Sequence, residues 1–208
     1  MTNPFLQPED YQEPACPLCM NGDTANRIPI KRIVEKLDEY LNRNDYNNAE
    51  KHLNYWITEA VVSGDLRGKL TLINERMGLY RKLARKDEAV ADAATGIDLI
   101  NKLHLQNDTT AGTTYLNAAT VYKAFGDSPK AILLYEKSLS IYQKTLAPTD
   151  SLFGGLYNNM ALALVDQQEF DRANTFYAKA LHVMEHIENG ELEQAITYLN
   201  MADAAAKE

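Results

Sequence analysis

The amino-acid sequence predicts an all-α fold in which helix hairpins repeat along the chain. Four segments share one pattern, in which a turn and an acidic or polar residue precede an alanine that opens a helix. These alanines are Ala49, Ala89, Ala131 and Ala173. Their spacings are 40, 42 and 42 residues, and a nearly fixed period of this length indicates a repeat architecture. No segment shows the sustained alternation that is typical of a strand.

The third and fourth units show the rest of the pattern, because six apolar positions recur in them at an offset of 42 residues. They are Tyr115, Ala119, Tyr122, Ala131, Tyr135 and Leu139, followed by Tyr157, Ala161, Leu164, Ala173, Tyr177 and Leu181. Within each half-unit these residues lie three or four apart, which places them on one helix face. Alanine lets two helices approach closely, and tyrosine or leucine fills the adjoining space. We therefore expect helix hairpins whose tyrosines, with Tyr80, pack in the core.

Nine helices are expected, and several residues mark their limits. The approximate ranges are 28–43, 46–62, 66–84, 87–104, 110–125, 128–146, 151–167, 170–188 and 192–206. Gly64, Pro148 and the Asn189-Gly190 pair are suited to follow helix ends. Asp108 and Asp150 are suited to cap the helices that they precede.

The helices divide into four hairpins and one unpaired helix. We expect an N-terminal extension at 1–27 and a repeat array at 28–208, with units at about 28–65, 66–108, 109–150 and 151–190 and a half unit at 191–208. In the last helix Tyr198, Ala202 and Ala205 repeat the first-helix spacing. This helix is either a cap on the array or the start of a further unit, and its many small apolar residues favour a chain that continues.

These units resemble the tetratricopeptide repeat. Tyr115 and Tyr157 stand at its Trp position, and Ala119 and Ala161 at its Gly position. The first Ala, the Phe and the second Ala of the pattern correspond to Ala131, Tyr135 and Ser138, and then to Ala173, Tyr177 and Ala180. The 42-residue period and the segments TYLNAATVY, LYNNMALAL and TYLNMADAA are similar to the kinesin-light-chain type. The resemblance implies a right-handed superhelical solenoid and a non-enzymatic scaffold that binds a protein or peptide.

In such repeats the first helices line a concave groove, and asparagines at matching heights often face it. Here they are Asn74, Asn117, Asn158, Asn159 and Asn200. An amide both donates and accepts hydrogen bonds, so a row of amides suits a peptide main chain. The alternative is that these amides bond within or between repeats.

Three basic residues of the first helices bear on the charge of the groove. Arg81, Lys82 and Lys123 would give its wall positive charge, which would favour an acidic peptide. The alternative for each of them is a solvated charge on a helix surface.

Composition excludes several classes of protein. The chain of 208 residues has 21 Lys and Arg against 29 Asp and Glu, a net charge of −8, which argues against binding to nucleic acid or an anionic membrane. No apolar run approaches the length of a membrane span, and the N-terminus lacks the features of a secretory signal. With only two cysteines, the chain is expected to be cytoplasmic. No phosphate-binding loop or hydrolase motif occurs, so we expect no enzymatic activity.

The N-terminal extension contains Cys16 and Cys19, whose spacing allows both thiolates to bind one zinc ion. A closed zinc site needs four ligands, which two chains could supply in a homodimer. A redox pair and a tail with free thiols are the alternatives. His182 and His186 have metal-compatible i, i+4 spacing on one helix, with an ordinary surface pair as the alternative.

Self-association through the unpaired last helix is a further hypothesis for the function.

Overall fold

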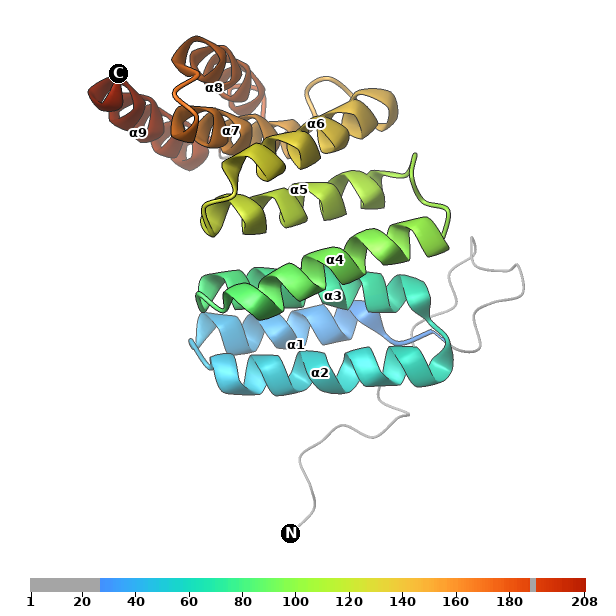
Figure 1. Cartoon of the computed structure of the whole chain (residues 1–208). Coiled ribbons are helices and arrows are strands. Elements are labelled where there is room, and N and C mark those ends of the chain that lie inside the picture. The colour runs from blue at the N-terminus through green and yellow to red at the C-terminus, as the bar shows by residue number, and fades with distance from the viewer. Residues whose placement is uncertain (1–26, 188–189) are drawn as a thin grey trace.

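The computed structural model describes residues 27–187 and 190–208, and within these ranges nine α-helices and no strands form. The helices are α1 (Ile30–Asn42), α2 (Tyr46–Ser63), α3 (Leu66–Lys82), α4 (Lys86–Lys102), α5 (Thr109–Ala124), α6 (Ser128–Thr145), α7 (Ser151–Asp166), α8 (Phe170–Met184) and α9 (Glu191–Lys207). All nine begin within two residues of the predicted positions. The fold class is confirmed: hairpins of helices stack into an all-α solenoid (Figure 1).

One helix end differs clearly from the prediction, because α8 stops at Met184 rather than at residue 188. The backbone N–H of His186 bonds to the carbonyl of Val183 at 3.0 Å, a three-residue bond that tightens the last turn. The side chain of Gln194, on α9, donates to the carbonyl of Met184 at 3.2 Å. A further turn of α8 would need that carbonyl as an acceptor. The bond from Gln194 of α9 occupies it where α8 ends.

Aspartates start five of the helices. Asp45, Asp65, Asp108, Asp127 and Asp150 precede α2, α3, α5, α6 and α7, and each carboxylate accepts a bond from a free backbone N–H of the first turn. These bonds satisfy donors that have no partner inside the helix. The expected caps at Asp108 and Asp150 are confirmed.

The turn inside each hairpin has the same backbone form in all four units. One residue has a positive φ: Asn44 at 55°, Ala84 at 56°, Gly126 at 86° and Gln168 at 60°. These residues lie five before the four repeat alanines and so keep their spacing of 40, 42 and 42. Gly64, the predicted end of α2, also has a positive φ, of 76°. The repeat therefore extends to the local backbone, although only Gly126 is a glycine among the four hairpin turns.

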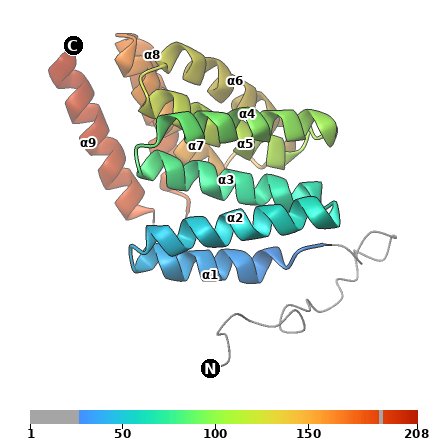
Figure 2. The same ribbon diagram turned by 60° about the horizontal axis from the view of Figure 1, so that its bottom comes forward.

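The hairpins stack so that their first helices also meet. Helix α3 contacts α5, α5 contacts α7, and α7 contacts α9, while each second helix packs mainly against its neighbours in the chain. The array therefore curves toward the first helices. Figure 2 shows α9 running steeply across the direction of α1 and α2.

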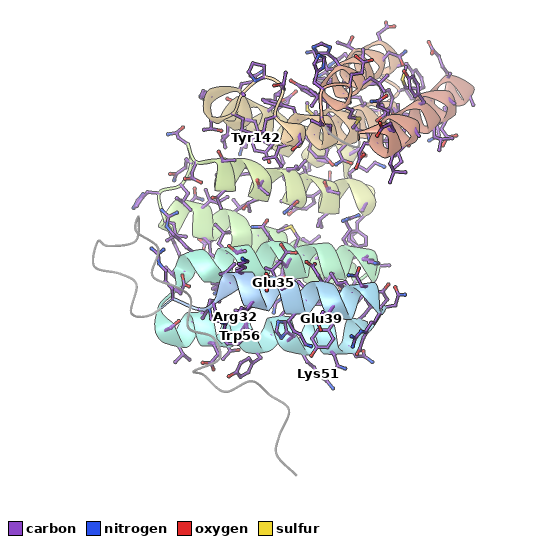
Figure 3. The ribbon with its side chains drawn as sticks, turned by 180° about the vertical axis from the view of Figure 1, so that it is seen from behind. Arg32, Glu35, Glu39, Lys51, Trp56 and Tyr142 are labelled. Carbon is purple, nitrogen blue, oxygen red and sulfur yellow. The ribbon has the colours of Figure 1, made fainter. Side chains whose placement is uncertain are left out.

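Close packing within a hairpin depends on small residues at particular places. A Cβ at Gly112, on α5, would lie 2.6 Å from the Cδ1 of Tyr142, so α5 reaches this ring on α6 only because the residue is glycine. Figure 3 shows Tyr142 on α6, far from Trp56 on α2. Tyr142 is fully buried, and its hydroxyl lies 2.9 Å from that of Thr113.

The buried apolar side chains form two clusters. One cluster runs from Ile28 in front of α1 to Val183 on α8 and holds most of the buried side chains. A smaller cluster joins the C-terminal half of α7 to α8 and α9; its buried members are Ala161, Leu164, Val165, Ala173, Tyr177 and Ala204. Five of the six tyrosines expected in the core are buried, and Tyr157 is partly buried between Phe153 and Phe176.

A polar network ties α2, α3 and α4 together. The guanidinium of Arg76 forms two bonds to the carboxylate of Asp92, at 2.9 and 2.7 Å, and a third to Asn54 at 2.6 Å. The side chain of Asp92 is only 5% exposed and that of Arg76 19%. The network therefore satisfies charges that the packing of three helices removes from water.

Candidate functional site

The inner layer of first helices contains a polar hollow between α3 and α5. Its volume is about 270 Å³, and it is lined by Asn74, Glu75, Gly78, Arg81, Asn117, Thr120 and Val121. On α3 the lining positions follow a spacing of three or four residues, which is one helix face. Three of the predicted groove residues, Asn74, Arg81 and Asn117, thus line one hollow.

Asparagine side chains bond to one another between repeats. The Nδ2 of Asn117 donates to the Oδ1 of Asn74 at 3.0 Å, and the Nδ2 of Asn74 donates to the carbonyl of Leu70 at 3.0 Å and to the hydroxyl of Thr114 at 2.9 Å. These are bonds of the kind that the alternative interpretation expected. Each amide can make four bonds, and within the described residues the Oδ1 of Asn117 has no protein donor.

A second asparagine pair joins α7 to α9. The Nδ2 of Asn200 donates to the Oδ1 of Asn158 at 3.2 Å, so this bond also links the first helices of consecutive units. Asn159 is partly buried beside this pair. The predicted asparagines therefore form two separate groups, one at α3 and α5 and one at α7 and α9.

The basic residues of the first helices lie in three different surroundings. Lys123 is 4.0 Å from the carboxylate of Asp166, and that carboxylate also accepts a bond from Ser128 at 2.9 Å. The ammonium of Lys82 lies over the ring of Tyr46, 5.1 Å from its centre. Arg81 lines the hollow. Only Arg81 thus places its charge beside the Asn74–Asn117 pair.

Glu75 is a residue of the hollow that the sequence interpretation missed. Burial, together with the charge of Asp38 on α1, raises the pKa of its carboxyl above the ordinary value. Within residues 27–187 and 190–208 no ion pair engages it. The signal was present in the sequence, because Glu75 adjoins Asn74 and lies three and six residues before Gly78 and Arg81 on the same helix.

The outer side of the first unit carries a chain of aromatic contacts. The ring of His52 lies between those of Tyr40 and Trp56, at centroid distances of 5.7 and 6.5 Å. Figure 3 shows Trp56 of α2 near Arg32 and Glu35 of α1. Trp56 is partly buried and packs against the main apolar cluster.

Two expectations concern metal ligands and membranes. Cys16 and Cys19 lie outside the described residues, so the zinc hypothesis stays a prediction. In the part of the chain that the structure describes, no helix combines the length and the apolar character needed to cross a membrane.

The comparisons with known proteins agree with this architecture. The family model described as "Tetratricopeptide repeat" matches residues 112–150 and 155–191, the two units with the clearest repeat pattern. Crystal-structure coordinates of BtubC (BKLC) from P. vanneervenii superpose with a TM-score of 0.75 at 17% sequence identity, covering 86% of this chain and 72% of that one.

A second solved structure, the first TPR domain of the human RPAP3 protein, has a TM-score of 0.47 at 15% identity and covers 66% of this chain and 95% of its own. No curated protein matches the sequence. The repeat period, the stacked hairpins and the two matched units lead to one conclusion: the chain contains tetratricopeptide repeats, matched at residues 112–150 and 155–191, within an all-α helical solenoid.

Proposed function

We propose that this protein is a non-enzymatic scaffold that binds a peptide segment of another protein along its first helices, with the hollow between α3 and α5 as the centre of the site. The observation that supports it is the set of uncommitted polar groups in the hollow. The Oδ1 of Asn117 accepts no bond from a described residue, and Glu75 and Arg81, of opposite charge, form no ion pair within the described part of the chain.

These groups favour a peptide that carries both acidic and basic side chains over a purely acidic peptide. The side-chain amide of Asn117 can pair with a main-chain N–H or carbonyl of the ligand, whatever the ligand's side chains are. Arg81 suits an acidic side chain of the ligand, and Glu75 suits a basic one. Burial raises the pKa of Glu75 because it disfavours the charged carboxylate. A cationic side chain of the ligand would stabilise that carboxylate, which has no ion-pair partner within the described residues.

A peptide library displayed on phage and selected on the immobilised protein tests this proposal. We expect the selected peptides, resynthesised, to bind wild-type protein and to lose roughly tenfold or more in affinity in the Asn117→Ala and Arg81→Ala variants, since a bond lost in a desolvated site costs about 1–3 kcal/mol. Gln143→Ala on α6 is the matched control, because it removes an exposed amide of a second helix. Unchanged affinity in both groove variants contradicts the proposal.

Self-association through α9 is a second candidate function, and it is supported by one observation. Leu192, Ile196 and Leu199 follow one face of α9 and are 68%, 45% and 67% exposed. In the preceding unit Tyr157 stands where Tyr198 does, and the second helix of its unit covers Tyr157 through Phe176, whereas Tyr198 is 55% exposed. Within the described residues nothing covers Leu199.

A second copy of α9 suits this face, since an antiparallel pair would bring Glu193 of one helix toward Lys207 of the other. We expect sizing with light scattering to show a dimer that Leu199→Glu dissociates, with Ala94→Glu on α4 as an exposed control. A monomer at all concentrations contradicts this second candidate and leaves the peptide site untouched.

A further inference from the structure

Three side chains with metal-binding chemistry gather at the C-terminal end of α8, outside the hollow between α3 and α5. They are His182, Glu185 and His186, all exposed, and their nitrogen and carboxylate oxygen atoms lie within 4.8 Å of one another. The two imidazole rings meet edge to face, with 4.7 Å between their centres. We propose that this cluster binds a divalent transition-metal ion of the zinc type, for which two imidazoles and a carboxylate are a suitable donor set.

The end of α8 sets the tautomer of His186. In a continuing helix its backbone N–H would bond to the carbonyl of His182, but here that N–H bonds to Val183 at 3.0 Å. The Nδ1 of the His186 ring takes the vacated place, 2.7 Å from the His182 carbonyl oxygen. A carbonyl only accepts, so Nδ1 carries the hydrogen. The Nε2 of the neutral ring therefore holds the lone pair that a metal ion needs.

The hydrogen bond from Nδ1 of His186 resembles the bonds that orient histidine ligands in metal sites. A histidine ligand usually donates its second ring N–H to a carbonyl or carboxylate, which fixes both the tautomer and the direction of the ring. The bond between Nδ1 and the His182 carbonyl is of this kind and is already present without a metal ion. The site is thus partly organised before an ion arrives.

Charge at the end of α8 also favours a cation. The aligned peptide dipoles of α8 give this end of the helix a partial negative charge. Glu185 adds a full negative charge, and within the described residues no Lys or Arg forms an ion pair with it. A divalent ion would therefore be bound where two sources of negative potential coincide.

Closing the site would require the ligand atoms to come closer together. Ligand atoms at about 2.0–2.1 Å from a tetrahedral ion lie about 3.4 Å apart. The present separations are within 4.8 Å and belong to exposed side chains of neighbouring residues at one helix end, whose rotation would bring the atoms together. Three protein ligands leave the fourth position open to water or to a donor from another molecule.

The repeat itself does not require these residues. One period earlier, on α6, the same positions are Ser140, Gln143 and Lys144, none of which would form such a site with its neighbours. The two units otherwise keep the same packing positions. The three ligands therefore belong to the fourth unit alone and are not a by-product of the repeat pattern.

Calorimetric titration with Zn²⁺ and Ni²⁺ tests the site. The full chain without an affinity tag, carrying Cys16→Ser and Cys19→Ser, removes the thiols as competing ligands. We expect one ion per chain, and an affinity that falls roughly tenfold or more in His182→Gln and in His186→Gln, the range seen even for outer-shell changes. His104→Asn is the control, because His104 is exposed and asparagine tolerates its φ of 55°. Circular dichroism verifies that each variant is folded.

A second measurement addresses the tautomer without any metal. Long-range ¹H–¹⁵N spectra of the imidazole nitrogens should show His186 protonated at Nδ1 and unprotonated at Nε2. Three results overturn the proposal: no ion bound per chain, equal affinity in the two histidine variants and the control, or only weak uptake at many places on the acidic surface. Binding that appears only when Cys16 and Cys19 are restored also overturns it.

Discussion

The hydroxyl groups of Tyr135 and Thr120 lie 3.1 Å apart and join α6 to α5 by a hydrogen bond. One period later, Tyr177 repeats Tyr135 in a fully buried position, but Leu162 stands where Thr120 did. The hydroxyl of Tyr177 is buried without a protein partner among the described residues. Two units with the same helix-hairpin fold thus differ in whether the hydroxyl of their core tyrosine has a hydrogen-bond partner.

Phenylalanine substitutions should separate the two tyrosines. Tyr135→Phe loses a hydrogen bond and should lower the free energy of unfolding by about 1 kcal/mol. Tyr177→Phe removes a buried polar group that has no partner, so it should be neutral or stabilising by up to about 1 kcal/mol. Urea denaturation followed by circular dichroism measures both, and Tyr55→Phe, on an exposed tyrosine, is the control. An equal loss in both buried variants contradicts the difference.

The same pair predicts how stability changes at alkaline pH. Burial raises the pKa of Tyr135 and of Tyr177 to about 12, whereas an unfolded tyrosine ionises near 10. Above pH 10 the unfolded chain binds fewer protons than the folded one, so the free energy of unfolding should fall as pH rises toward 12. Thermal melts at pH 9, 10 and 11 measure this fall, and Tyr177→Phe should reduce it.

The network around Arg76 predicts a large loss for a single substitution. Asp92→Ala leaves the guanidinium of Arg76 without its carboxylate, 19% exposed among three helices, and should destabilise the fold by about 2–4 kcal/mol. Asp98→Ala is the matched control, because Asp98 and Lys102 are each about three-fifths exposed in their ion pair. It should change stability by less than about 0.5 kcal/mol. Similar losses for the two variants would show that burial of the Asp92 pair is not what matters.

The hairpin turns predict opposite effects for exchanges of alanine and glycine. Gly126→Ala places a Cβ at a φ of 86° with nothing within 4 Å of it, so backbone strain alone should cost about 1–2 kcal/mol. Ala84→Gly removes the same strain at a φ of 56° and should be stabilising or neutral. Urea midpoints measure both, and Gly155→Ala, in an exposed and open place on α7, should be stabilising.

Glu75 predicts a trade between stability and ligand binding. Its raised pKa means that the folded state holds the proton more tightly than the unfolded state, so Glu75 lowers stability as pH rises above about 4.5. Glu75→Gln should therefore stabilise the protein at pH 7 and leave stability at pH 4 nearly unchanged. The same variant should weaken selected peptides that carry a basic residue. Lower stability at pH 7 in Glu75→Gln contradicts this account.

The sequence predicted the helices well because the repeat shows the same pattern four times. Starts marked by Asp108 and Asp150 and the turn at Gly64 depend on local chemistry, which a single segment contains. The end of α8 at Met184 was not predictable in this way, because it depends on Gln194 of the next helix. A bond between helices leaves no signal in either helix alone.

The candidate site was only partly predictable for a similar reason. Asn74 is 43 residues before Asn117 and so falls one position out of the 42-residue register, yet the two amides bond. Their meeting is decided by how neighbouring hairpins are rotated in the stack, which the period within the sequence does not specify. Glu75 has neither an amide nor a positive charge, the two features that predicted groove residues, although it lies on the same helix face as Arg81.

The division of the apolar core has a consequence for how the molecule opens. The smaller cluster, which ends at Ala204, borders the large one within α7, and the partly buried Ile132 and Phe176 pack against both clusters. Backbone amides of α8 and α9 should therefore exchange with deuterium sooner than those of α3 to α6, through opening of the C-terminal end while the remainder stays folded. Local opening would then be most frequent beyond Val183 and least frequent around Met77 and Tyr122.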